Sequence, residues 1–434
     1  MKPATGNCTI PKPVRTFTDP VTGVTGDNMN TTCTLPTPVR TFTDPETGAT
    51  MHQLTGGDLP AVSLYFTQPT WTAGGRHFLF LRKTPDRAIN YWCVDPDGRE
   101  RQLTRFSVTP NLPKYGQWMH RKKLAEECER FSWLWPAIHP TQPVIVFPLH
   151  GEVFELNVET GRCEKLFAFD PKVCEQGFFA VYQQFTADGK HLIFSTAVRG
   201  HRLDAPYLPT DASLKDESTW EGRLFRYDYA NRRMEGEIFV SNGEQAHLLA
   251  CPWDPEILFW ANYKHACLYA MRRDGTGLRS WFIDDPRAHA GHYSWDPANR
   301  AVVTLVSDTH DQWRTHVARL NMDTGSVTHF SSLVLPDGQW HPNASPDGKL
   351  IVHDRGPGSV LGLYLQDPAT DTTRLLCRID SSWGLADEAG QAVKCEWLHP
   401  NPVWTPDGRH VIFHSDFGSK TAHTWAVEVP ERKD

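Results

Sequence analysis

The chain has 434 residues, of which 39% are hydrophobic and 11% aromatic, so it carries ample material for a packed core. This composition excludes a largely disordered protein. The 44 Lys and Arg residues and 51 Asp and Glu residues give a net charge of -7. The sequence shows no basic stripe of the kind that binds nucleic acid, and no apolar stretch long enough to cross a bilayer. We therefore expect neither a nucleic-acid partner nor a membrane anchor.

The ten cysteines are scattered and form no CxxC pair. This spacing argues against a zinc knuckle or a thioredoxin-like site and predicts mostly free, buried thiols. The N-terminal residues Met1 to Gly6 contain no apolar core of the kind found in signal peptides. We expect a cytoplasmic protein, and a periplasmic or secreted location stays open for a chain whose signal peptide was removed.

A short duplication occupies the N-terminal region. The eight residues Pro13 to Pro20 repeat as Pro38 to Pro45, which is followed by Glu46-Thr47-Gly48. The second copy resembles a hairpin, and two copies would compete for one place in a sheet. We expect residues 1–37 to form a loose tail and residues 38–434 to form a single domain.

One unit then recurs along the chain. Its pattern is an aromatic residue, a short polar turn that often contains Asp-Gly, and an apolar strand. The copies are Trp71 to Phe80, His139 to Phe147, Phe185 to Phe194, Trp253 to Trp260, Trp295 to Val303, Ala344 to Val352 and Trp404 to Phe413. Only residues 118–132 could form a helix. A period of about 40 to 70 residues is typical of repeat arrays and propellers.

A second hairpin follows the first in most repeats, as at Asp97-Gly98 and Asp274-Gly275. Two hairpins make four strands, which is one blade of a β-propeller. The last repeat ends without a second hairpin, and the segment from Val39 to Leu54 resembles the missing piece. The sequence therefore predicts an all-β, seven-bladed β-propeller whose ring is closed by an N-terminal strand.

Several polar and aromatic residues precede the repeated turns. They are candidates for contacts to a ligand, although the same positions also carry packing and solvated polar groups. The candidates are Gln68, Gln183, His247 and Trp340. A long insertion, residues 199–221, adds Arg199 and Arg202. Loops of this length often cover binding sites, and these two arginines would suit an anionic ligand.

A set of metal-ligating side chains stands before the last turn. Glu396, His399 and Asn401 lie at positions i, i+3 and i+5, and His341 lies at a matching offset before the turn one repeat earlier. Two imidazoles with carboxylate and amide oxygens suit manganese or a similar divalent ion. The alternative is that these residues only cap strands at the mouth of the ring.

These pieces resemble the oligogalacturonate lyase family of seven-bladed propellers, which cleave uronate oligosaccharides by β-elimination. The resemblance rests on Thr41 to Gly48 and on the segment Glu396-x-x-His399-Pro400-x-Pro402, where the family has Gln-x-x-His-Pro-His-Pro. It implies that His341, Glu396, His399 and Asn401 hold manganese. Glu396 stands in place of the family's Gln, and Asn401 in place of its second His.

The resemblance also implies catalytic roles. The segment Gly291 to Trp295 resembles the family's His-x-x-Trp, in which the histidine is the catalytic base, and this assigns that role to His292. The family's substrate-binding arginine corresponds to Cys267, so Lys264 or His265 would have to replace it. An imidazole suits a general base because its ordinary pKa is about 6.5.

The expected function is a lyase for an acidic, oligogalacturonate-like oligosaccharide. Two alternatives remain at the level of the sequence. One is a lyase for a different uronic-acid glycan, which the departures at Asn401 and Cys267 favour. The other is a non-catalytic propeller that binds carbohydrate or protein, because a propeller fold does not define a function.

Overall fold

The computed structural model contains strands and short connections throughout its described part. It describes residues 35–85, 88–106, 136–149, 152–169, 182–199, 220–242, 245–262, 267–281, 292–307, 315–335, 339–355, 361–381, 400–419 and 421–431. Within these ranges the only helical segments are two 3₁₀ turns, η2 (Ala73–Gly75) and η6 (Pro297–Asn299). The helix predicted at 118–132 lies outside the described residues. No helix among the described residues is long and apolar enough to span a membrane.

Five separate sheets of four antiparallel strands follow one another along the chain. The first two contain β7 (Ala137–Ile138), β8 (Val144–Leu149), β9 (Glu152–Asn157) and β10 (Cys163–Ala168), then β11 (Tyr182–Phe185), β12 (His191–Arg199), β13 (Trp220–Asp228) and β14 (Arg233–Asn242). The third contains β15 (Gln245–Ala250), β16 (Ile257–Asn262), β17 (Cys267–Arg272) and β18 (Arg279–Trp281). The fourth contains β19 (Tyr293–Asp296), β20 (Ala301–Ser307), β21 (Thr315–Asn321) and β22 (Val327–Leu335). The fifth contains β23 (Gln339–Ala344), β24 (Ile351–Arg355), β25 (Gly362–Asp367) and β26 (Thr372–Arg378).

The sixth sheet has nine strands and joins the two ends of the chain. One part contains β3 (Ala61–Ser63), β4 (Phe78–Lys83), β5 (Ile89–Val94) and β6 (Glu100–Gln102). The other part contains β27 (Val403–Trp404), β28 (His410–Ser415), β29 (His423–Glu428), β2 (Thr50–Gln53) and β1 (Arg40–Thr43). A single parallel bridge between His423 and Ala61 connects the two parts.

The predicted pairing between the two ends of the chain is confirmed. Strand β2 runs antiparallel to β29, with Met51 opposite Val427 and Gln53 opposite Trp425. Strand β1 then pairs with β2 and forms the outer edge. The second copy of the duplicated segment therefore occupies the place in the sheet, and the first copy lies outside the described residues.

Each of the seven repeat copies lies on an antiparallel strand pair joined by a tight turn. At the turn after β23, the Ser345 hydroxyl donates to Asp347, and the amide of Leu350 donates to the same hydroxyl at 3.0 Å. Gly348 has a φ of +68°, a conformation that costs a glycine little. The repeated Ser/Thr-x-Asp-Gly sequence forms this turn because each residue meets a local hydrogen-bonding or backbone requirement.

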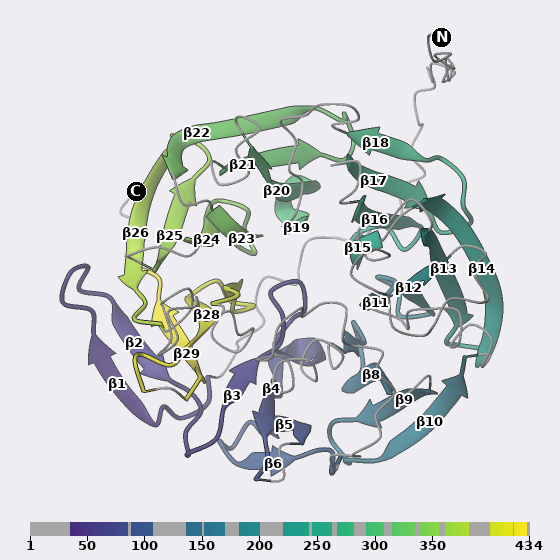
Figure 1. Cartoon of the computed structure of the whole chain (residues 1–434). Helices are drawn as coiled ribbons and strands as arrows, with labels where there is room; N and C mark the ends of the chain where they lie inside the picture. The colour runs from purple at the N-terminus through teal and green to yellow at the C-terminus, as the bar shows by residue number, and fades with distance from the viewer. Residues whose placement is uncertain are drawn as a thin grey trace, which may run out of the picture.

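The hydrophobic core lies between neighbouring sheets. One cluster, for example, joins Leu249 and Phe259 of the third sheet to Tyr293 and Leu320 of the fourth. Figure 1 shows the sheets following one another around a central axis. This packing directs the first strand of each sheet toward the centre. The four cysteines whose side chains are described, Cys93, Cys163, Cys251 and Cys377, are free thiols, and all but Cys163 are buried, as predicted.

Candidate active site

Strand register places one residue of each repeat at an equivalent position near the centre. The first turn of each repeat begins at a residue such as Ser345, whose backbone amide donates to the carbonyl of Leu350. The equivalent residue lies four positions earlier, which in this repeat is His341. In β19 the same count leads from Asp296, opposite Ala301, back to His292. The equivalent residues among those described are Gln68, Tyr182, His247, His292, His341 and Asn401. Five predicted site residues from different repeats therefore share one position: Gln68, His247, His292, His341 and Asn401.

Three of these equivalent residues have a left-handed backbone. The φ angles are +53° for His247, +35° for His341 and +48° for Asn401. In β15 and β23 the strand register shifts at this point, between Ala246 and Leu249 and between Trp340 and Asn343. Such a bulge turns a side chain out of the regular alternation of a strand, and bulges are common beside active sites. Backbone strain is thus present at three of the candidate site positions.

Three histidines from three consecutive sheets form a cluster. The ring centroids of His292 and His341 are 4.4 Å apart, and those of His247 and His292 are 5.3 Å apart. His247 and His341 are buried, and His292 is half-buried. Tyr182, the equivalent residue of the preceding sheet, stacks on His247 at 5.0 Å. Histidines that are about 45 residues apart in the sequence are therefore in ring contact at the centre.

A buried carboxylate fixes the orientation of His341. Nδ1 of His341 lies 3.0 Å from Oδ2 and 3.2 Å from Oδ1 of Asp354, on the neighbouring strand β24. Both side chains are at most 1% exposed. The carboxylate keeps the proton on Nδ1, which donates to it, and so leaves the lone pair on Nε2. This carboxylate–histidine pairing is typical of metal-bound imidazoles, and sequence reasoning missed Asp354.

No protein-family model matches the chain, and no curated protein is similar to it in sequence. Solved structures do match. An oligogalacturonate lyase from Vibrio parahaemolyticus superposes with a TM-score of 0.68 at 18% identity, covering 90% of this chain and 96% of that one. An oligogalacturonate lyase in complex with manganese superposes with a TM-score of 0.67 at 20% identity and the same coverage. The chain has the fold of the oligogalacturonate lyases.

A loop of the first repeat reaches into the centre of this oligogalacturonate-lyase fold. Leu79 pairs with Thr70, whereas Phe80 pairs with Ser63, so residues 64–69 leave the strand as an insertion (Figure 1). The ring of Phe66 lies 4.6 Å from that of His341 and 5.9 Å from that of His292. The side-chain amide nitrogen of Asn343, Nδ2, donates to the backbone carbonyl of Phe66 at 3.0 Å and anchors the loop.

Tyr65 and Phe66 thus form an aromatic wall against the histidine cluster. Tyr65 packs on His247 with ring centroids 5.4 Å apart. Sequence reasoning missed both residues, because Leu64 to Pro69 reads as an ordinary strand-to-turn connection. Behind Phe66 lies a cavity of about 160 Å³, lined by Phe66, Thr67, Gln68, Pro69, Leu249, Ser294, Trp295, Asn343 and Val403. The loop therefore borders the histidine cluster on one side.

The other predicted residues divide into three groups. The side chain of Gln68 is buried, and its Oε1 has no hydrogen-bond partner among the described residues. Gln183 is also buried but is one position beyond Tyr182, so it points to the opposite face of β11. Only the backbone is described for Arg199, the last residue of β12, and for Trp340, the second residue of β23. Lys264, His265, Arg202, Glu396 and His399 lie outside the described residues.

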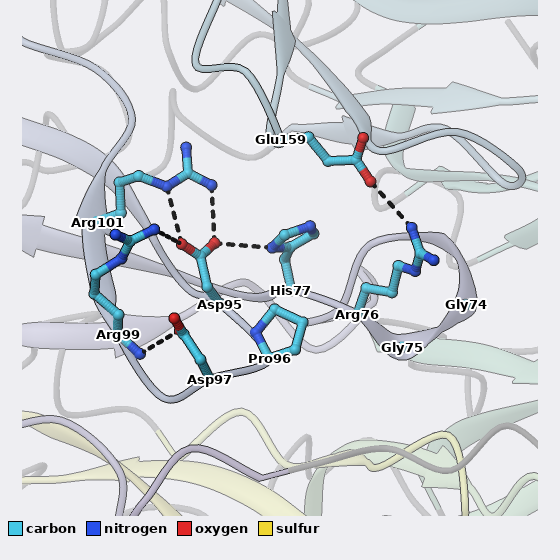
Figure 2. Close-up of a pocket in the computed structure, with 10 residues that line it drawn as sticks. All are labelled: Gly74, Gly75, Arg76, His77, Asp95, Pro96, Asp97, Arg99, Arg101 and Glu159. Atoms are coloured by element: carbon cyan, nitrogen blue, oxygen red, sulfur yellow. Dashed lines mark hydrogen bonds and ion pairs between the residues drawn. The ribbon is translucent and has the colours of Figure 1, made fainter.

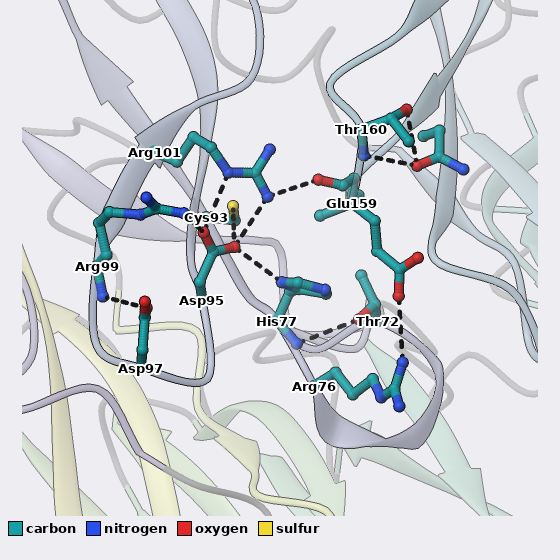
Figure 3. Close-up of polar contacts among 12 residues, drawn as sticks. Thr72, Arg76, His77, Cys93, Asp95, Asp97, Arg99, Arg101, Glu159 and Thr160 are labelled. Carbon is teal, nitrogen blue, oxygen red and sulfur yellow. Dashed lines mark hydrogen bonds and ion pairs between the residues drawn. The ribbon is translucent and has the colours of Figure 1, made fainter.

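A second hollow, of about 740 Å³, lies at the turn ends of the first two repeats (Figure 2). At its centre Asp95 accepts hydrogen bonds from Arg101 at 2.8 and 3.1 Å. His77 Nδ1 lies 3.0 Å from Asp95 Oδ1, and Arg99 binds Oδ2 at 3.3 Å (Figure 3). The hydrogen bond from Arg101 lowers the pKa of the Asp95 carboxyl. Both oxygens of the Asp95 carboxylate therefore already have hydrogen-bond partners.

The second hollow does not suit a metal, although His77, Cys93 and Asp95 lie within ligand distance of one another. Two guanidinium groups already bind Asp95 and would repel a cation. Burial raises the pKa of the Cys93 thiol to about 12, whereas a metal ligand must be a thiolate. The network is a structural ion cluster, and the histidine cluster at the centre of the sheets remains the candidate active site.

We expect Asp95→Ala to lower the free energy of unfolding by about 3 kcal/mol, because it leaves Arg101 and His77 without their buried partner. Denaturant unfolding followed by circular dichroism would measure this. Arg76→Ala is the matched control, since its pair with Glu159 is 68% and 44% exposed and contributes little. Equal stability of the two variants would contradict the assignment.

Proposed function

We propose that the chain is a polysaccharide lyase that cleaves uronate-containing oligosaccharides, of the oligogalacturonate type, by metal-assisted β-elimination. The observation that carries the proposal is the contact of His292 with His341 at 4.4 Å, with Asp354 behind His341. One imidazole is thereby placed beside another that is oriented as a metal ligand. The shared fold supports the proposal, and the structural neighbour in complex with manganese agrees with it.

We infer further that the sheets are the seven blades of one closed propeller. Five four-stranded sheets account for five blades. The nine-stranded sheet contributes the other two, because a single bridge separates its two parts. Pairing of β2 with β29 supports closure by the N-terminal strand. In such a ring the equivalent residue of every blade faces the same channel, which agrees with the histidine contacts.

The proposed metal is a divalent ion, with manganese as the preferred ion. His341 and Asn401 would hold it, together with Glu396 and His399 from outside the described residues. The donor set of imidazole nitrogens and carboxylate or amide oxygens fits such an ion. The buried Asp354 supports this fit because it directs the proton of His341 away from the channel. The chemistry supplied by a bound ion is neutralisation of the substrate carboxylate, which makes the adjacent C5 proton more acidic.

His292 is the proposed base. Its neutral imidazole takes the C5 proton of the uronate, the electron pair of the C–H bond forms the C4–C5 double bond, and the bond between C4 and the bridging oxygen breaks. The leaving oxygen takes a proton from a second group or from solvent. Phe66 and Tyr65 restrict water on one side of the histidine cluster, because their rings pack against it. The product carries an unsaturated uronate at its new end.

The test is an assay of ultraviolet absorbance by the unsaturated uronate. Metal-stripped protein would be supplied with manganese and incubated with oligogalacturonate, with oligosaccharides of other uronic acids, and with a neutral oligosaccharide as control. A rise on one uronate that a chelator abolishes is the expected result. The uronate that reacts fastest would define the substrate class. No rise on any uronate from manganese-loaded protein would overturn the proposal in favour of a binding propeller.

A further inference from the structure

Three side chains that the proposed reaction does not use converge on one face of the terminal sheet. His52 lies on β2, Glu428 on β29 and His410 on β28, which are adjacent strands. His410 is directly opposite Glu428, and His52 is opposite Ala426, two positions from Glu428. Because side chains alternate along a strand, the three project from one face. The pairing that brings the two ends of the chain together therefore also builds this cluster.

The geometry within the cluster suits a small cation. One ligand atom from each residue lies within 4.8 Å of the others. His52 Nε2 is already 3.0 Å from Glu428 Oε1, and the ring centroids of His52 and His410 are 6.1 Å apart. Zinc ligands at about 2.0–2.2 Å from a tetrahedral ion are roughly 3–3.5 Å from each other. Small side-chain rotations are enough to reach that spacing.

The surroundings of both imidazoles leave nitrogens for a metal. Without a metal, Nε2 of His52 donates to Glu428 at 3.0 Å. Nδ1 lies 3.0 Å from the hydroxyl of Thr41, which can accept the ring proton when a metal takes the lone pair of Nε2. Nδ1 of His410 is buried and has no hydrogen-bond partner among the described residues. Burial also lowers the pKa of His410, which favours its neutral, metal-binding form. No arginine or lysine forms an ion pair with Glu428 among the described residues.

We propose that His52, His410 and Glu428 bind a zinc ion that fastens the N-terminal hairpin to the C-terminal strands. Two imidazoles and one carboxylate are a ligand set that zinc accepts, with water in the fourth position. The three ligands come from segments separated by up to 376 residues, so the ion holds the two ends of the chain in register. The upstream copy of the duplicated segment has Asp27 in place of His52, so only the copy in the sheet supplies an imidazole.

The test is zinc titration of the metal-stripped full-length chain by calorimetry. We expect the wild type to bind one more equivalent of zinc than His410→Gln or His52→Gln. Zinc should raise the Tm of the wild type by more than it raises that of either variant, because only the wild type holds the additional ion. Thr41→Val retains all three ligands but loses the hydroxyl behind His52, and its Kd for zinc should rise about tenfold.

Two controls separate this site from the channel. His191 occupies the first position of β12, as His410 does in β28, and it has Glu235 at 3.6 Å. Among the described residues no second histidine completes a ligand group with this pair. His191→Gln should bind as much zinc as the wild type. His341→Ala should still bind zinc at His52, His410 and Glu428, whether or not the channel binds an ion. The result therefore does not depend on lyase activity. Equal zinc stoichiometry in the wild type, His52→Gln and His410→Gln would overturn the proposal.

Discussion

His292→Ala is expected to lower kcat for the uronate substrate by about 10³-fold, within the range attributed to a general base. The affinity for manganese should stay unchanged, because the substituted residue touches His341 by ring contact and is not a proposed ligand. Steady-state rates of the ultraviolet change, combined with a manganese titration, would measure both quantities. Added imidazole should restore part of the rate, since it can occupy the space left by the side chain and accept the proton.

The control for His292 is His316→Ala. His316 and His329 form another histidine pair, with 2.9 Å between Nε2 and Nδ1, on strands β21 and β22 of the same sheet. This variant should keep its kcat. A His292→Ala protein that folds and binds manganese but retains the wild-type rate would exclude His292 as the base.

Asp354→Asn is expected to weaken manganese binding by about 10- to 100-fold. The replacement preserves the shape of the side chain but removes the charge that holds the proton on His341 Nδ1 at 3.0 Å. The amide can present its NH₂ group to that nitrogen instead, which would favour the wrong tautomer. Titration of the metal-stripped protein with manganese would give the affinity, and activity at saturating manganese would show how much is recovered.

The matched control for Asp354 is Asp95→Asn, which alters the other buried histidine–aspartate pair, at 3.0 Å from His77. It should bind manganese as the wild type does when measured well below its unfolding temperature. If both variants lost affinity equally, the effect would reflect general destabilisation. If neither did, His341 would not be a metal ligand that depends on Asp354.

Much of the fold was predictable because it depends on local sequence. Each Ser/Thr-x-Asp-Gly segment specifies its own turn, and the alternating apolar residues beside it specify the strands. Pairing of β2 with β29 was also predictable, since the last repeat lacks a hairpin and the segment from Val39 to Leu54 resembles one. Counting positions before each turn was enough to place His292 and His341 together.

Other parts of the site were not predictable from local patterns. Asp354 belongs to a different strand from His341, and its role depends on cross-strand register. Tyr65 and Phe66 reach the histidines only because six residues leave the first strand as an insertion. The left-handed backbone at His247 and His341 likewise accompanies shifts in strand register, which the residue types there do not predict. Tertiary packing determines each of these features.

Pairing of β2 with β29 also has a consequence for biosynthesis. His52 is made long before Glu428, and 376 positions separate them. At about 5–20 residues per second, the ribosome needs roughly 20–75 s to cover that distance. Throughout this interval β2 has no partner on the side that β29 will occupy, and an unpaired strand edge readily pairs with other chains. The nascent protein is thus most prone to association while it is still on the ribosome, and this exposure ends when its C-terminal strands emerge.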